Sequence, residues 1–206
     1  MLEYYAQHPL YAVLVIALAL LALFVLVKAF KASSRRSKKV NAIIEKMKEE
    51  NELLNKYSIL TGDLISSSDS AELFKGIGVG LQKRVSDKPD MKAEFDSFSD
   101  EQKYIYAMYT FLQDAEESMS NFFSTSTKPL TSTAAEAVEK VIASGDFREA
   151  FLAEYNATDE DNEEVSYNPD EMAKWDEKAA PSIADGTVCK AFGDFIKQNA
   201  SAFIPR

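Results

Sequence analysis

Histidine, cysteine and tryptophan each occur only once in the 206 residues, which excludes much familiar chemistry. A single cysteine cannot close an internal disulfide, and the one histidine, at position 8, leaves the rest of the chain without imidazole for a zinc cluster or a catalytic triad. Cys189 is therefore predicted to be a small core residue rather than a nucleophile. We expect no metal, no cofactor and no catalytic residue, and predict that the protein is not an enzyme.

Basic side chains are scarce in the distal half of the chain. The whole sequence has 33 acidic and 23 basic side chains, a net charge of −10. Residues 1–93 have 14 basic and 10 acidic side chains, whereas residues 94–206 have 9 and 23, so the two parts carry +4 and −14. Such an acidic domain repels nucleic acid and attracts basic proteins, which argues against direct nucleic-acid binding. The alternative is that the charge only keeps the domain soluble.

Polar residues are missing from a run near the N-terminus, LYAVLVIALALLALFVLV at residues 10–27. At a helical rise of 1.5 Å per residue this run is about 27 Å long, close to the roughly 30 Å hydrocarbon core of a lipid bilayer. The alternatives are a buried core helix, for which the run is too long, and a cleaved signal peptide, which needs basic residues before it and small residues after it. The sequence predicts one transmembrane helix over residues 10–30.

The charges that flank this run are asymmetric. Glu3 is the only charged side chain before it, whereas six cations follow it: Lys28, Lys31, Arg35, Arg36, Lys38 and Lys39. By the positive-inside rule, we expect residues 1–9 outside the cell membrane and the large C-terminal domain in the cytoplasm.

The remaining chain divides into a linker at residues 31–60 and an acidic domain at residues 61–206. In the linker, Val40, Ile43, Ile44, Met47 and Leu54 approximate a helical stripe, which either forms homo-oligomers or packs on the domain. No stretch alternates apolar and polar residues with period two. The predicted fold class is therefore all-α, with one N-terminal transmembrane helix followed by a cytoplasmic helical domain.

Capping residues and apolar spacing place the helices of the domain. The glycines at 76, 78 and 80 lack the strand and the Lys-Ser/Thr of a phosphate loop, and are expected to let another helix approach closely. The predicted helices are one through residues 73–85 capped by Asp69 or Ser70, a long one from Ser99 through residue 123, one from Ser132 or Thr133 that stops at Gly145, and three more over 147–155, 168–178 and 188–199.

An acidic run precedes the helix at 168–178. Its carboxylates do not fit a calcium loop, because Glu164 stands where an EF-hand needs glycine and Asp170 where it needs glutamate. We interpret it as a solvated loop. Trp175 is either a core anchor or an exposed contact. The candidate partner-binding residues are Asp159, Glu160, Asp161, Glu163, Glu164 and Trp175.

Residues from about 99 to 203 resemble the DNA-mimic-protein-like family of small acidic helical proteins. The resemblance rests on SDEQKY at 99–104, NFFS at 121–124, the alanine-rich segment at 136–143 and FGDFIKQN at 192–199. It implies an all-helical acidic fold without catalysis, and a DNA-binding protein as partner.

These observations favour a membrane-anchored interaction module whose acidic domain binds a basic protein partner. The alternative is a structural subunit of a membrane complex that self-associates through the juxtamembrane helix. A third hypothesis, a membrane-tethered enzyme, would need Tyr104, Tyr106 and Tyr109 or carboxylates to meet in one pocket.

Overall fold

A computed structural model describes residues 40–115, 118–158 and 168–204. The chain forms two compact units, Met1–Glu49 and Glu50–Arg206. Of the first unit, only residues 40–49 are described, and they are helical. The predicted transmembrane segment at 10–30 lies outside the described residues. Within the described ranges, no helix combines the length and the apolar character that crossing a bilayer demands.

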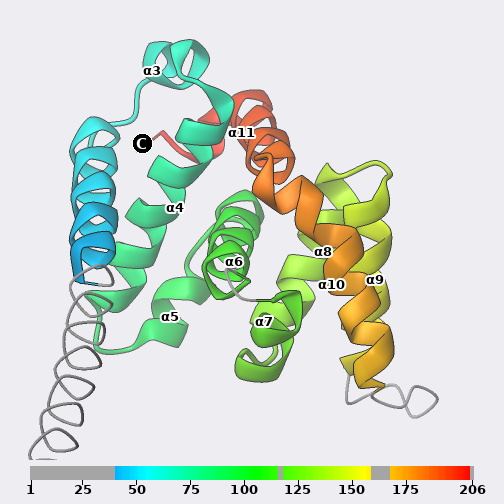
Figure 1. Cartoon of the computed structure of the whole chain (residues 1–206). Coiled ribbons are helices and arrows are strands. Elements are labelled where there is room, and N and C mark those ends of the chain that lie inside the picture. The colour runs from blue at the N-terminus through cyan, green and yellow to red at the C-terminus, as the bar shows by residue number, and fades with distance from the viewer. Residues whose placement is uncertain (1–39, 116–117, 159–167, 205–206) are drawn as a thin grey trace, which may run out of the picture. The chain divides into compact units, whose positions relative to one another are not determined.

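The fold is all-α, as predicted, and no strand occurs in the part of the chain that the structure describes (Figure 1). The second unit opens with helical residues 50–56, of which Leu53 is buried together with Tyr57 just beyond them. Nine α-helices follow among the described residues: α3 Gly62–Ser67, α4 Ser70–Ser86, α5 Met91–Asp96, α6 Asp100–Asp114, α7 Met119–Thr125, α8 Leu130–Val141, α9 Asp146–Thr158, α10 Pro169–Ala184 and α11 Thr187–Gln198. A short 3-10 turn, η1 Ala200–Ala202, comes after them.

Helices α4 and α11, far apart in sequence, pack together closely. Gly193 of α11 lies against the backbone of Ser70, where a Cβ atom would overlap the Ser70 carbonyl. The Ser70 hydroxyl donates a hydrogen bond of 2.5 Å to Asp194, and the rings of Phe74 and Phe192 are 5.8 Å apart. This contact closes the end of the chain onto the start of the domain.

Helix α6 packs against both α4 and α8. It begins at Ser99, as predicted, with a capping box in which the Ser99 hydroxyl accepts from the amide of Gln102 and the Gln102 side chain accepts from the amide of Ser99. Phe111 then reaches an aromatic cluster, with its ring 5.3 Å from Phe122 and 4.9 Å from Phe151. Contacts of this geometry stabilise a core beyond area burial alone.

The glycines of α4 permit the close approach that the sequence predicts, at two of three positions. A Cβ atom on Gly76 would overlap the ring of Tyr57, and one on Gly78 the ring of Tyr109, whereas Gly80 faces open space. These glycines lie inside a helix, capped at its start by Asp69 as predicted. The segment is thus not a phosphate loop.

The predicted long helix from Ser99 to residue 123 is wrong. Helix α6 ends at Asp114, and α7 begins after Ser118, whose hydroxyl accepts from the amide of Asn121 as an N-cap. The apolar spacing continues across this break, since Met119, Phe122 and Phe123 are all buried. Periodicity alone therefore conceals the interruption.

Two other predicted boundaries also need correction, and two short helices must be added. Helix α8 begins at Leu130, before Ser132, and its first turn has no side-chain cap. Helix α10 continues past residue 178 to Ala184, because Ala179 and Ile183 still pack against the core and Pro181 lies only in the last turn. Two short helices that the sequence did not predict, α3 and α5, are capped by Thr61 and Asp90.

Candidate interaction surface

Most of the net charge of the protein lies in residues 146–184, which include helices α9 and α10. Residues 146–184 contain twelve acidic and three basic side chains, a net charge of −9 within a chain of −10. The two helices pack together along one side of the domain (Figure 1). We call these residues the acidic hairpin.

Local sequence determines how each helix of the hairpin begins. Before α9, Gly145 has a φ of +120°, a conformation that favours glycine, and Asp146 and Glu149 occupy the first turn. Before α10, the Asn168 side chain accepts from the amide of Asp170, Pro169 takes the first helical position, and Glu171 follows. Acids at helix N-termini are stabilised by the helix dipole, so the composition of the hairpin suits its fold.

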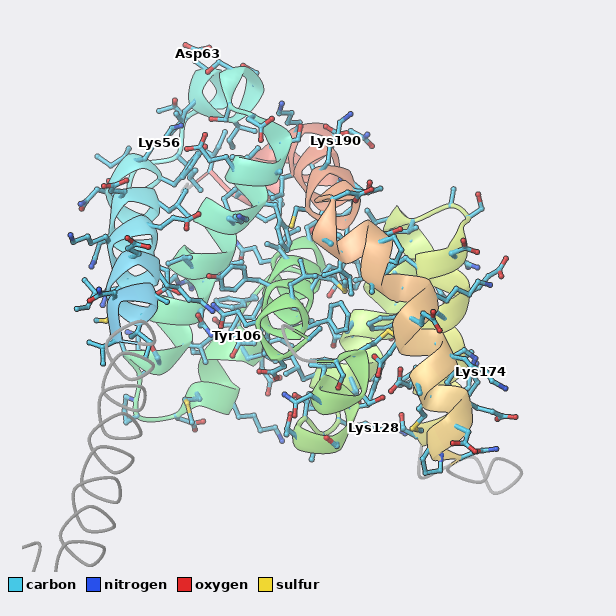
Figure 2. All side chains as sticks on the ribbon, in the orientation of Figure 1. Lys56, Asp63, Tyr106, Lys128, Lys174 and Lys190 are labelled. Atoms are coloured by element: carbon cyan, nitrogen blue, oxygen red, sulfur yellow. The ribbon has the colours of Figure 1, made fainter. Side chains whose placement is uncertain are left out.

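The three bases of the hairpin neutralise only part of its charge. Lys178 on α10 forms ion pairs with Glu149 at 2.6 Å and Asp146 at 3.4 Å on α9, which link the two helices. Lys174 is exposed and extends from the outer side of α10 (Figure 2). Asp170, Glu171 and Glu177 are exposed acids on α10. The outer surface of the hairpin thus presents excess carboxylates to solvent.

The predicted partner-binding residues separate into two groups. Asp159, Glu160, Asp161, Glu163 and Glu164 lie outside the described residues, between the ends of α9 and α10. Trp175 is partly buried and packs against the core, which favours the core-anchor interpretation over an exposed contact. It lies next to Asp176, at the inner side of the hairpin.

Sequence reasoning missed Glu154, an acidic residue in the core. Its side chain is 0% exposed, on the same face of α9 as Phe147, Ala150 and Phe151. Among the described residues, neither carboxyl oxygen of Glu154 has a hydrogen-bond partner. The signal was available in the sequence, because a glutamate stands at a core position of an otherwise apolar helical stripe.

Burial raises the pKa of Glu154 from 4.5 to about 7. The nearby Ser120 hydroxyl on α7 lowers this pKa to a smaller extent, although its hydrogen bond goes to Asp176 and not to Glu154, and the negative charge of Asp176 on α10 raises the pKa further. The Ser120 hydroxyl itself donates to Asp176 at 3.2 Å. Asp176 also accepts from the backbone amide of Met119 at 2.5 Å, so it holds the first turn of α7 against α10.

The other candidate residues do not form a site. The pKa of the Cys189 thiol is raised by burial, which makes it a poor nucleophile. The three tyrosines diverge: the Tyr104 ring lies 6.3 Å from Phe195, the Tyr106 ring 5.4 Å from Phe95, and Tyr109 covers Gly78. In the described ranges, no three side chains of the metal-binding types gather closely enough to hold an ion.

No family model matches the chain, and no curated protein or solved structure is significantly similar to it. The resemblance to the DNA-mimic-protein-like family is untested by these comparisons and stays a prediction. Fold and surface together define an all-α domain with a strongly acidic helical hairpin.

Proposed function

We propose that the protein is a single-pass membrane protein whose acidic domain binds a basic protein partner in the cytoplasm. The observation that carries this proposal is the concentration of charge in the acidic hairpin, −9 within residues 146–184. Carboxylates concentrated in one part of the domain steer a basic protein toward it, which raises the association rate and gives the contact its orientation. Residues 10–30 serve as the anchor in this proposal, with residues 1–9 outside.

Binding of poly-L-lysine, a defined basic probe, tests the role of the hairpin in the detergent-solubilised full-length chain. The variant Glu171→Gln/Glu177→Gln removes two exposed charges of α10. Its matched control, Asp63→Asn/Asp96→Asn, removes two exposed charges from α3 and α5. We expect the hairpin variant to bind more weakly and with a smaller salt dependence, and the control to bind like the unmodified protein. Equal losses in the two variants would show that the hairpin has no special role.

A second candidate function is a structural subunit that self-associates through the juxtamembrane helix. The observation in its favour is an apolar stripe on helical residues 40–49 whose side chains are exposed: Val40 by 45%, Ile43 by 59%, Ile44 by 45% and Met47 by 56%. Spacings of three and four residues are typical of helices that pair through one face.

Light scattering of the full-length chain in detergent distinguishes this candidate. A subunit of this kind forms a defined oligomer that is insensitive to salt and is dissociated by Ile43→Glu/Ile44→Glu. The control Asn41→Glu/Lys48→Glu changes charge on other faces of the same helix and should leave the oligomer intact. A monomer at every concentration would eliminate this candidate.

A further inference from the structure

Three helices meet around Glu154. Helix α9, which carries it, packs against α7, α8 and α10, and the side chain is fully enclosed. A buried carboxyl without a hydrogen-bond partner is rare in folded proteins, because the ionised form loses its hydration without compensation. This position therefore tolerates a neutral acid far better than a carboxylate.

The charged groups around Glu154 favour the neutral form as well. Among the residues that the structure describes, Asp176 on α10 is the charged side chain that shifts the pKa of Glu154, and it raises that pKa. From α7 the nearby polar group is the Ser120 hydroxyl, which is committed to Asp176. Arg148 on α9 does not shift the pKa of Glu154. The charged side chains of α8, which are Glu136, Glu139 and Lys140, are exposed and do not shift it either.

We propose that Glu154 is a protonation switch that sets how tightly α7 and α10 pack on α9. When Glu154 holds its proton, the junction is neutral at this position and closed. When Glu154 releases the proton to solvent, a second negative charge appears in the interior beside Asp176. The repulsion and the missing hydration are relieved if water enters between the helices, which loosens α7 and α10.

The coupling passes through Asp176. This carboxylate accepts from the amides of Met119 and Ser120 and from the Ser120 hydroxyl, so it joins α7 to α10. A negative charge on Glu154 would repel the Asp176 carboxylate and so weaken the contact between α7 and α10. The contact between α4 and α11 does not involve Asp176 and should not respond. The inference does not depend on the proposed partner binding, because it concerns only the domain itself.

Hydrogen exchange of the full-length chain in detergent tests the switch. Amide protection, corrected for the intrinsic effect of pH, is compared at about pH 5.5 and about pH 8.5, on either side of the proposed transition. In the unmodified protein, we expect protection in α7 and α10 to fall by about tenfold at the higher pH, with α4 and α11 unchanged. Glu154→Gln should keep the protection of the low-pH form at both values.

Glu177→Gln is the matched control, because Glu177 is an exposed acid on α10. This variant should respond to pH like the unmodified protein. Fluorescence of Trp175, the only tryptophan, reports the same junction in the unmodified protein even if Glu154→Gln does not fold. Flat protection and flat fluorescence between the two pH values would overturn the proposal, as would an equal pH response in Glu154→Gln.

Discussion

At the scale of single residues, the raised pKa of Glu154 makes the stability of the folded protein depend on pH. Its pKa is about 7 in the folded protein against 4.5 for an unburied glutamate. Because the folded state holds the proton more tightly than the unfolded state, stability is highest below pH 4.5 with respect to this group. It falls as pH rises toward 7, and is constant above. The total effect is about 3 kcal/mol at 1.36 kcal/mol for each pH unit.

The first prediction follows from this difference. Glu154→Gln removes the ionisable group and keeps its size, so the variant should match the unmodified protein near pH 5 and exceed its stability near pH 8 by about 2 to 3 kcal/mol. Urea unfolding followed by Trp175 fluorescence measures both values. A lower stability of the variant at the higher pH would contradict the burial of a charge at this position.

The second prediction concerns the neighbour of Glu154. Asp176→Asn keeps an oxygen that can accept from the amide of Met119 but removes the negative charge that raises the pKa of Glu154. The pH midpoint of the Trp175 signal should therefore move to lower pH. The shift should be partial, since burial is the larger cause. A midpoint that moves upward would show that Asp176 does not act through its charge.

Residue-scale features differ in how far the sequence predicts them. The caps at Asp69, Ser99 and Asn168 are confirmed, because a cap depends on residues within one helical turn. The environment of Glu154 depends on two other helices. Ser120 on α7 lies 34 residues before Glu154 in the sequence, and Asp176 on α10 lies 22 residues after it. Such tertiary contacts leave no local pattern beyond the odd glutamate in an apolar stripe.

At the scale of helices, the close packing of α4 with α11 requires glycine at position 193, because any side chain there would overlap the backbone of α4. Gly193→Ala would place a methyl group on the carbonyl of Ser70, which is backbone and cannot turn aside. We predict a loss of about 3 kcal/mol in stability, since the two helices must separate. Gly80→Ala, in α4, is the control: its Cβ meets open space, so the gain in helix propensity should leave stability unchanged or raise it by up to about 1 kcal/mol. Equal effects of the two changes would refute the close packing.

The boundaries of helices were harder to predict than their existence. The stripe of apolar residues runs through the α6 and α7 break without interruption, so nothing in the spacing marks residue 115 as an end. Helix α7 begins where Ser118 caps it and where Asp176, from another helix, accepts from its first amide. The predicted end of α10 at residue 178 is likewise too early, because the buried Ala179 continues the apolar face of the helix.

At the scale of the whole molecule, charge is arranged along the chain in a definite order. Six cations follow the apolar run at residues 10–27, and residues 94–206 carry −14. The proposed anchor places the cations at the membrane surface, where anionic lipids contribute about 1 kcal/mol for each nearby base. The same lipids would repel the acidic domain in this proposal.

The last prediction tests that arrangement through its orientation. Replacing Lys31, Arg35, Arg36, Lys38 and Lys39 by glutamine leaves one cation, Lys28, beside the apolar run, so the charge bias that would retain this flank in the cytoplasm in the proposed arrangement largely disappears. Protease added to sealed right-side-out vesicles should spare the acidic domain of the unmodified protein and digest a substantial fraction of it in the variant. A control with Lys83, Lys88 and Lys92 changed to glutamine alters charge farther along the chain and should stay protected. Extraction of the unmodified protein by alkaline carbonate would contradict the proposed transmembrane anchor. Protection of the variant from protease would show that something other than these cations sets the orientation.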